Sequence, residues 1–233
     1  MEVAMPATPA VEAVDVHRVY KVGTRDVHAL RGINMSVAPG EFVAVKGRSG
    51  SGKTTLLNAI GGLDQPTSGQ VLIFGQDTAR MSDRQRTRWR AQQVGFIFQS
   101  FGLLPTLSAY ENVELMLRIA GKGRKVRHDR TLYCLNLVGL SKWIHHRPSE
   151  MSGGQQQRVA IARALANEPS LILADEPTGE LDSTTAREIL TLFQNICAGE
   201  DVTMLMATHD PLVDDYVDRI LQLKDGQIVT PGG

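Results

Sequence analysis

The sequence predicts an α/β protein, in which helices cover a parallel sheet and an N-terminal antiparallel β subdomain and a small helical subdomain are attached. Short runs that are apolar on both faces recur at 42–45, 96–98, 171–174 and 204–207, as in the buried strands of a parallel sheet. The N-terminal region instead alternates apolar and polar residues, which is typical of half-buried antiparallel strands. A long central stretch has apolar residues only at helical spacing.

The N-terminal half contains two strand signals followed by a change from strand to helix. Alternation at 11–20 and again at 34–37 predicts two half-buried antiparallel strands. The buried run at 42–45 then leads directly into a glycine-rich turn and an apolar helix around 56–60. This order places any ligand of the turn at the N-terminus of a helix.

The C-terminal half repeats the alternation of buried strand and helix. Between the runs at 171–174 and 204–207, apolar residues recur at helical spacing from 186 to 197. A helix between two buried strands indicates a crossover connection and therefore a parallel sheet. The segment 221–223, followed by Asp225 and Gly226, predicts a terminal hairpin.

The length of 233 residues accommodates one large domain with a subdomain and leaves little room for two. Residues 1–10 have no periodic pattern, and we expect them to form a mobile tail. Residues 11–233 are then a single domain. Its helical patterns fall within about 100–154, which we expect to be a helical subdomain inserted into the core.

The composition excludes several classes of protein. Hydrophobic residues make up 42% of the chain, and 25 Lys and Arg balance 25 Asp and Glu. Because a protein that binds nucleic acid as its main task needs an excess of positive charge, no nucleic-acid partner is expected. The two cysteines lack metal-ligand spacing and are expected in the core. No apolar run is long enough to span a membrane and no signal peptide is visible, so we expect a cytoplasmic chain.

The strongest functional motif is a phosphate-binding loop. Residues 47–54 match G-x-x-x-x-G-K-[ST] between a buried strand and a helix. Glycines let backbone N–H groups converge on phosphate, Lys53 neutralises its charge, and the Thr54 hydroxyl can ligate Mg²⁺. An incidental glycine and serine turn is the weaker alternative. The nucleotide-binding residues expected here are Gly47, Arg48, Ser49, Gly50, Ser51, Gly52, Lys53, Thr54 and Thr55.

Two carboxylates follow the buried run at 171–174. In open α/β sheets ligands collect at the carboxyl ends of the strands, so Asp175 is a candidate Mg²⁺ ligand. Glu176, one residue further into the site, is placed to polarise a water for attack on a γ-phosphate. A structural role for the second carboxylate is the alternative, but the phosphate loop favours catalysis.

A second glycine-rich turn precedes another helix and is again an anion site. It consists of Ser152, Gly153, Gly154 and Gln155. One nucleotide does not obviously need two such sites. This turn resembles the signature of ATP-binding cassette (ABC) ATPases, and Arg158 and the carboxylate pair follow it as in that family. The resemblance covers the chain from about Val11 onward, and it implies a P-loop NTPase core that uses ATP and Mg²⁺.

The family's motifs assign roles to further residues. The resemblance makes Tyr20 the aromatic residue that stacks on adenine, although a strand-end tyrosine half in the core is an alternative. It makes Gln99 the residue that senses Mg²⁺ and the attacking water and links to the membrane partner. His209 matches the histidine that contacts the γ-phosphate, where an exposed bystander is the alternative. Glu180 and Asp182 lie in the loop that touches the opposite subunit.

The resemblance also implies a mechanism and partners. Two copies meet head to tail, and each signature turn closes on the nucleotide held by the other copy. ATP binding closes the dimer, and hydrolysis reopens it. The work is done on an integral membrane permease, so the subunit is expected on the inner face of the cell membrane.

Several strings resemble the lipoprotein-release and macrolide-export (LolD/MacB-like) branch of bacterial cassettes. They lie at 61–64, 66–69, 99–107 and 174–179. This branch implies a lipoprotein, peptide or drug-like cargo, moved directly or by transmitted conformational work. Two residues depart from the branch pattern, Arg48 in the phosphate loop and Glu180 in the dimer loop. Their opposite charges could meet across the dimer interface, or both could be independent surface substitutions.

Two other functions compete with this one. A soluble ABC ATPase that acts on DNA or ribosomes would usually carry long insertions or two cassettes, whereas the segment 99–152 is short and occurs once. A small-molecule kinase would use the phosphate loop, but it leaves the turn at 152–155 unexplained. The ATP-hydrolysing transporter subunit therefore remains the leading hypothesis.

Overall fold

The computed structural model describes residues 8–229, so residues 1–7 of the expected tail lie outside the described residues. Ala10, the last residue of that expected tail, is fully buried. Its amide donates to the Val37 carbonyl at 2.8 Å, and its carbonyl accepts from the Phe74 amide at 3.0 Å. These bonds attach Ala10 to Val37 and Phe74, and they correct the expected boundary of the tail. The sequence pattern did not predict them because both partners are far away in the sequence.

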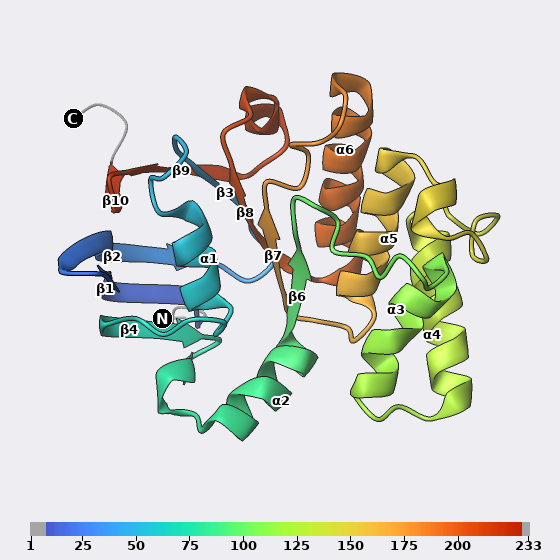
Figure 1. The fold of residues 1–233 in the computed structure, drawn as a ribbon, viewed down its shortest axis with the longest axis horizontal. Helices are drawn as coiled ribbons and strands as arrows, with labels where there is room; N and C mark the ends of the chain where they lie inside the picture. Colours follow the sequence, from blue (N-terminus) through green and yellow to red (C-terminus); the bar gives the residue numbers. More distant parts are fainter. Residues whose placement is uncertain (1–7, 230–233) are drawn as a thin grey trace, which may run out of the picture.

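The antiparallel β subdomain predicted at the N-terminus is confirmed (Figure 1). Its strand order is β2-β1-β4-β5. The strands are β1 (Val11–Val22), β2 (Arg25–Val37), β4 (Ser68–Ile73) and β5 (Gln76–Asp77). β2 begins well before the predicted alternation. Its first residues, 25–28, are exposed and therefore show no alternation, and pairing with β1 holds this part of the strand. Alternation reveals a strand only where one of its faces is buried.

The second sheet contains the predicted parallel core and has the strand order β10-β9-β3-β8-β7-β6. β3, β8, β7 and β6 pair in parallel, and β9 and β10 form the predicted hairpin. The strands are β3 (Phe42–Lys46), β6 (Val94–Ile97), β7 (Leu171–Asp175), β8 (Thr203–Thr208), β9 (Arg219–Lys224) and β10 (Gln227–Val229). The carboxyl ends of the parallel strands therefore meet at one edge of the sheet.

Helices occupy both sides of this sheet and the far end of the molecule (Figure 1). The phosphate loop leads into α1, and α6 packs on the sheet beside α5, while α3 and α4 form the expected helical region. The helices are α1 (Lys53–Ile60), α2 (Asp83–Gln93), α3 (Ala109–Ile119), α4 (Arg124–Leu137), α5 (Gly153–Leu165) and α6 (Ser183–Glu200). Short 3₁₀ segments are Thr78–Arg80, Pro148–Glu150 and Pro211–Asp215. Among the described residues, no helix combines the length and the apolar character needed to cross a membrane.

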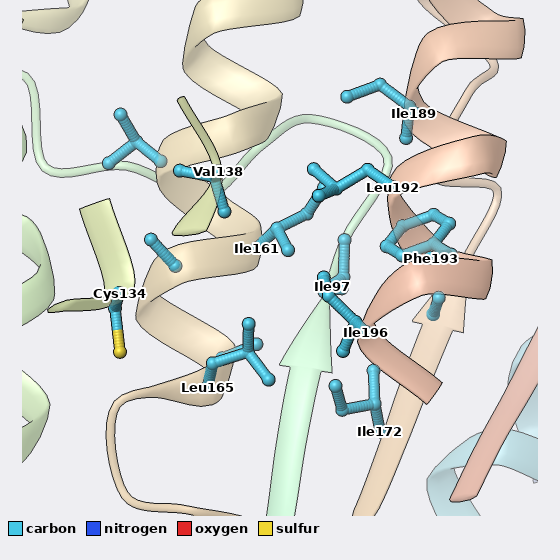
Figure 2. Packing of buried hydrophobic residues seen from close by; sticks show 14 of the residues in the cluster. Ile97, Cys134, Val138, Ile161, Leu165, Ile172, Ile189, Leu192, Phe193 and Ile196 are labelled. Atoms are coloured by element: carbon cyan, nitrogen blue, oxygen red, sulfur yellow. The ribbon is translucent and has the colours of Figure 1, made fainter. Parts of the chain in front are cut away.

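The helical region is joined to the sheet by a continuous core (Figure 2). Phe193 of α6 and Leu165 of α5 lie in the same cluster as Ile97 of β6, and all three are at most 1% exposed. Burial of each such side chain stabilises the fold by about 1.5–3 kcal/mol. Cys134 of α4 is fully buried there, and burial raises the pKa of its thiol to about 11. α5 is thus packed between the sheet and the helical region.

Candidate functional site

The phosphate loop lies between the end of β3 and the N-terminus of α1. Gly52 is the N-cap of α1 with φ 106°, a left-handed backbone that residues with side chains rarely adopt. A Cβ atom on Gly52 would lie 2.6 Å from the Ala29 carbonyl oxygen of β2, so only glycine fits. The loop therefore directs the positive end of α1 toward the space above the sheet edge.

A cleft of about 710 Å³ opens above this loop. Residues that are distant in the sequence share it, because the parallel strands β6, β7 and β8 all end at this edge. The predicted residues that line the cleft are Arg48, Ser49, Gly50, Gly52, Lys53, Thr54, Thr55, Gln99, Glu176 and His209. The lining also includes Val27, His28 and Ala29 of β2, which sequence reasoning missed because this part of β2 shows no alternation.

Lys53 and Glu176 form a charged pair at the floor of the cleft. The Lys53 ammonium is 3.3 Å from Glu176 Oε1, and the two side chains are 8% and 15% exposed. Lys53 also donates to the carbonyls of Gly47 at 2.8 Å and Arg48 at 3.3 Å. These bonds hold the ammonium beside the phosphate loop and place a carboxylate next to it.

His209 is coupled to Glu176 from the end of the neighbouring strand. Its Nδ1 lies 3.0 Å from both carboxylate oxygens, and its backbone N–H donates to Oε2 at 3.3 Å. The backbone of Glu176 is left-handed with φ 47°, and its amide donates to the Ala207 carbonyl at 2.8 Å. Gln157 of α5 adds a hydrogen bond to the Pro177 carbonyl at 2.7 Å. These contacts from the end of β8 and from α5 hold Glu176 and the residue after it in place.

Asp175 has the properties of a metal ligand. Its Oδ1 atom is buried and has no hydrogen-bond partner. Burial raises the pKa of Asp175 above its ordinary value, although a hydrogen bond with the Thr54 hydroxyl and the charge of Lys53 oppose the shift. A buried carboxylate oxygen without a donor is costly unless a cation completes it. Asp175 and Thr54 therefore fit Mg²⁺.

Gln99 follows β6 and lines the cleft next to the loop after Glu176. A Cβ atom on Gly179 would lie 3.4 Å from the Gln99 amide nitrogen. The side chain of Gln99 is therefore packed between the cleft and the loop that continues to Asp182. Asp182 is the N-cap of α6, and it accepts hydrogen bonds from the backbone amides of Thr184 and Thr185. This capping role was not predicted from the sequence.

Tyr20 is not among the residues that line the cleft. It is, however, the direct cross-strand partner of Val27, and Val27 lines the cleft. Directly opposed residues on antiparallel strands project from the same face. The Tyr20 hydroxyl donates to Asp64 at 2.6 Å, and the Arg18 guanidinium lies 4.4 Å from the ring centroid. Arg18 also donates twice to Asp64, at 2.7 and 2.8 Å. The ring of Tyr20 is thus held beside the cleft.

The second glycine-rich turn lies outside this cleft. Ser152 is the N-cap of α5 and forms a capping box with Gln155. A Cβ atom on Gly154 would lie 2.5 Å from Thr185 Cγ2, and the Thr185 hydroxyl is itself bonded to Asp182 at 2.6 Å. No residue of this turn lines the cleft around Lys53. The two glycine-rich turns at helix N-termini are therefore separate, and of these two only the phosphate loop lines the cleft with the charged groups.

A family model described as "ABC transporter" matches residues 30–179. The chain is 48% identical over 225 residues to the macrolide export ATP-binding/permease protein MacB of Syntrophobacter fumaroxidans, covering 96% of this chain and 32% of that protein. It thus spans about a third of that relative. It is 45% identical over 220 residues to the lipoprotein-releasing system ATP-binding protein LolD 2 of Caulobacter vibrioides, covering 94% of this chain and 96% of that one.

A solved structure has the same arrangement of elements. It is a dimeric, post-hydrolysis state of an ATP-binding cassette of Methanocaldococcus jannaschii, bound to ADP and Pi. The likeness has a TM-score of 0.87 at 44% identity and covers 94% of this chain and 97% of that one.

Proposed function

This chain belongs to the ABC transporter family as an ATP-hydrolysing cassette, and on that premise we propose how its residues bind and cleave ATP and what it works with. The observation that carries the proposal is the convergence, in one cleft, of the phosphate loop with Gln99, Glu176 and His209. Three strands and one loop contribute these groups. Together they provide a cradle for phosphates, a cation and a base, which are the parts that phosphoryl transfer to water requires.

Lys53 and the loop amides hold the β- and γ-phosphates, and Glu176 orients the attacking water. Glu176 suits this role because its carboxylate faces the cleft within 3.3 Å of the lysine and is only 15% exposed. His209 positions the Glu176 carboxylate through its Nδ1 contacts and contacts the γ-phosphate. Val27 and Tyr20 provide an apolar face for adenine on the strand pair beside the loop.

Thr54, Asp175 and Gln99 would hold Mg²⁺. When bound, this ion would neutralise phosphate charge and fix the phosphate oxygens. The buried, unpartnered Oδ1 of Asp175 supports the assignment, as does the hydroxyl of Thr54 beside the same carboxylate. A bound cation would favour the charged form of Asp175, because an adjacent positive charge lowers a carboxyl pKa.

A second copy of the chain completes each site. The turn of Ser152 to Gln155 presents a helix N-terminus, yet it does not face the chain's own cleft. A head-to-tail pair lets this turn meet the phosphate held by the other copy, with Glu180 and Asp182 at the contact. ATP then lies between two helix N-termini and closes the dimer.

The partner on which the work is done is an integral membrane permease. A mostly apolar groove of about 350 Å³ is lined by residues on either side of Gln99 in the sequence, Phe98 and Gly102, and is bounded by β6, α3 and α5. Phe98 and Leu104 are 41% and 44% exposed at this groove. A permease segment docked there would keep the chain at the inner face of the cell membrane. The proposed cargo is the lipoprotein, peptide or drug-like molecule that the sequence resemblance implies, and the names of the MacB and LolD relatives mention macrolide export and lipoprotein release.

The decisive experiment is Glu176→Gln, which removes the charge and retains the shape. We expect ATP affinity to change little and turnover to fall by about 100-fold or more, since the water loses its base. ATP should also trap this variant as a dimer in light scattering. Near-normal hydrolysis would remove Glu176 from the catalytic role, and a monomer with ATP bound would contradict the shared site.

The permease proposal is tested by affinity purification from detergent-solubilised membranes. A co-purifying integral membrane protein that is lost in a Leu104→Glu variant would support docking at the groove. Recovery of ribosomes or DNA instead would favour a soluble ABC ATPase. As a control, Val229→Glu changes an exposed residue on β10, away from the groove, and should retain the partner.

A further inference from the structure

The chain after Gln99 makes an unusual turn. Phe101 and Gly102 follow one another with φ 57° and 61°, both in the left-handed region. For Phe101 this backbone is sparsely populated and strained, so surrounding contacts must hold it. The turn starts two residues after Gln99 and therefore determines where that side chain enters the cleft.

Besides the turn's own backbone bonds, such as that from the Phe101 amide to the Phe98 carbonyl at 3.2 Å, the contacts that hold the turn come from Arg163 of α5. Its Nη2 donates to the Phe101 carbonyl at 2.9 Å, and its Nη1 donates to the Gly102 carbonyl. Arg163 is partly buried where it lines the groove between β6, α3 and α5, and this burial lowers the pKa of its guanidinium. A guanidinium presents two N–H groups in a fixed plane, so it fixes two successive carbonyls at once.

The same segment also touches the start of α5. A Cβ atom on Gly153 would lie 3.7 Å from Phe101 Cζ and 3.5 Å from Leu181 Cδ2. The Phe101 ring therefore packs against the signature turn, while its carbonyl is bonded to Arg163 ten residues further along the same helix. The segment that carries Gln99 is attached to α5 at both ends of that helix.

We propose that Arg163 is a positioning residue for ATP hydrolysis: by clamping the Phe101 and Gly102 carbonyls to α5, it sets the position of Gln99 and ties Gln99 to the signature turn. The inference deepens the function proposed above and rests on it. Without the two hydrogen bonds from Arg163, the turn relaxes and the Gln99 side chain moves from its position in the cleft. The phosphate loop and Lys53 remain intact. The defect should therefore appear in the rate of hydrolysis and not in ATP affinity.

The test compares Arg163→Met and Arg163→Lys with Arg130→Met as a matched control. Arg130 also donates to two backbone carbonyls, those of Leu165 and Ala166, but at the other end of α5 from the signature turn. We expect Arg163→Met to lower kcat by about 10- to 100-fold with the Kd for a fluorescent ATP analogue changed less than about threefold. Arg163→Lys keeps the positive charge but loses the planar pair of donors, so its kcat should lie between those of the wild type and Arg163→Met. Arg130→Met should lower the Tm and leave kcat within about twofold.

A double mutant separates positioning from a general structural defect. If Arg163 acts through Gln99, Arg163→Met should lower kcat no further in a Gln99→Ala background. Multiplicative losses, or an equal loss of kcat in Arg130→Met, would overturn the inference. If Arg163→Met does not fold, the same cycle is run with Arg163→Lys. The proposed function would be contradicted by a different result, which is normal ATP hydrolysis by the Glu176→Gln variant.

Discussion

The molecule has two glycine-rich turns that each begin a helix, and they differ in what surrounds them. The phosphate loop faces a cleft that contains Lys53, Glu176 and His209. The turn at the start of α5 lies outside that cleft and is packed against Thr185 and Leu181. Both turns present a helix N-terminus, but of these two only the phosphate loop has a lysine, a glutamate and a histidine beside it. A helix N-terminus by itself offers an anion site, whereas the side chains of the cleft are brought together by the ends of several strands.

The largest effect is expected from changing Lys53, which tests the first turn. Lys53→Ala removes the cation beside the phosphate loop and the bonds that hold it. ATP turnover should fall by at least about 100-fold, because a charge-assisted contact to phosphate and its positioning are lost together. Phosphate-release assays at saturating ATP measure this. Normal turnover would mean that the cleft around Lys53 is not the reaction site.

Mixing two inactive variants tests whether the second turn acts on the other copy. Gly154→Ala places a Cβ atom 2.5 Å from Thr185 Cγ2 and should distort the turn, whereas Gly153→Ala meets only ordinary contacts of 3.5 Å or more. We expect Gly154→Ala to lose activity by about tenfold or more and Gly153→Ala to lose much less. A mixture of Lys53→Ala and Gly154→Ala should regain activity, because one site of each mixed dimer is intact. A mixture as inactive as its parts would contradict completion in trans.

A smaller effect is expected at the adenine face. Tyr20→Ala should raise the Kd for ATP by about 5- to 100-fold, since stacking of a base on an aromatic ring contributes about 1–3 kcal/mol. Tyr20→Phe keeps the ring and loses only the bond to Asp64, so its Kd should stay near that of the wild type. GTP and ATP affinities measured side by side report whether the base is contacted. Equal affinities of Tyr20→Ala and wild type would exclude stacking.

The carboxylate that holds Tyr20 gives a pH-dependent prediction. Burial alone would raise the pKa of Asp64, but hydrogen bonds from Tyr20, the Gln65 amide and Arg18 outweigh it, so the pKa is below its ordinary value. Its stabilising contribution is therefore present above the unfolded-state pKa of about 3.9 and is lost as the pH falls below that value. The Tm difference between wild type and Asp64→Asn should shrink from pH 7 to pH 3. A difference that grows toward low pH would contradict this sign.

The smallest effect is expected for the charges of Arg48 and Glu180, which are both exposed in the single chain. If they meet across the dimer interface, each alanine variant should weaken ATP-dependent dimerisation in a Glu176→Gln background by less than about tenfold. In the double-mutant cycle the two losses should be less than additive and should weaken with salt. Additive, salt-independent losses of dimerisation would show that Arg48 and Glu180 are unrelated surface charges.

Much of this architecture was predictable because its causes are local. The run at 42–45, the glycine pattern of 47–54 and the carboxylates after 171–174 are all found where the sequence predicted them. A buried strand, a tight turn and a helix start each depend on a few neighbouring residues. The match of the chain to the ABC family confirms the resemblance that these motifs carried.

Other features depend on contacts between residues that are distant in the sequence. Tyr20 and Asp64 are 44 residues apart, and Arg163 and Phe101 are 62 apart. No pattern around Arg163 distinguishes it from a solvated helix residue, because its partners are backbone carbonyls, which every residue carries.

Local sequence patterns were thus enough to predict the fold class, the phosphate loop and the candidate site residues. The contacts that hold these residues in place, the burial of Ala10 and the position of the turn at 152–155 outside the cleft came from the packing of the chain. This division arises because local patterns encode which element forms, whereas the packing of elements against one another fixes which of their atoms meet.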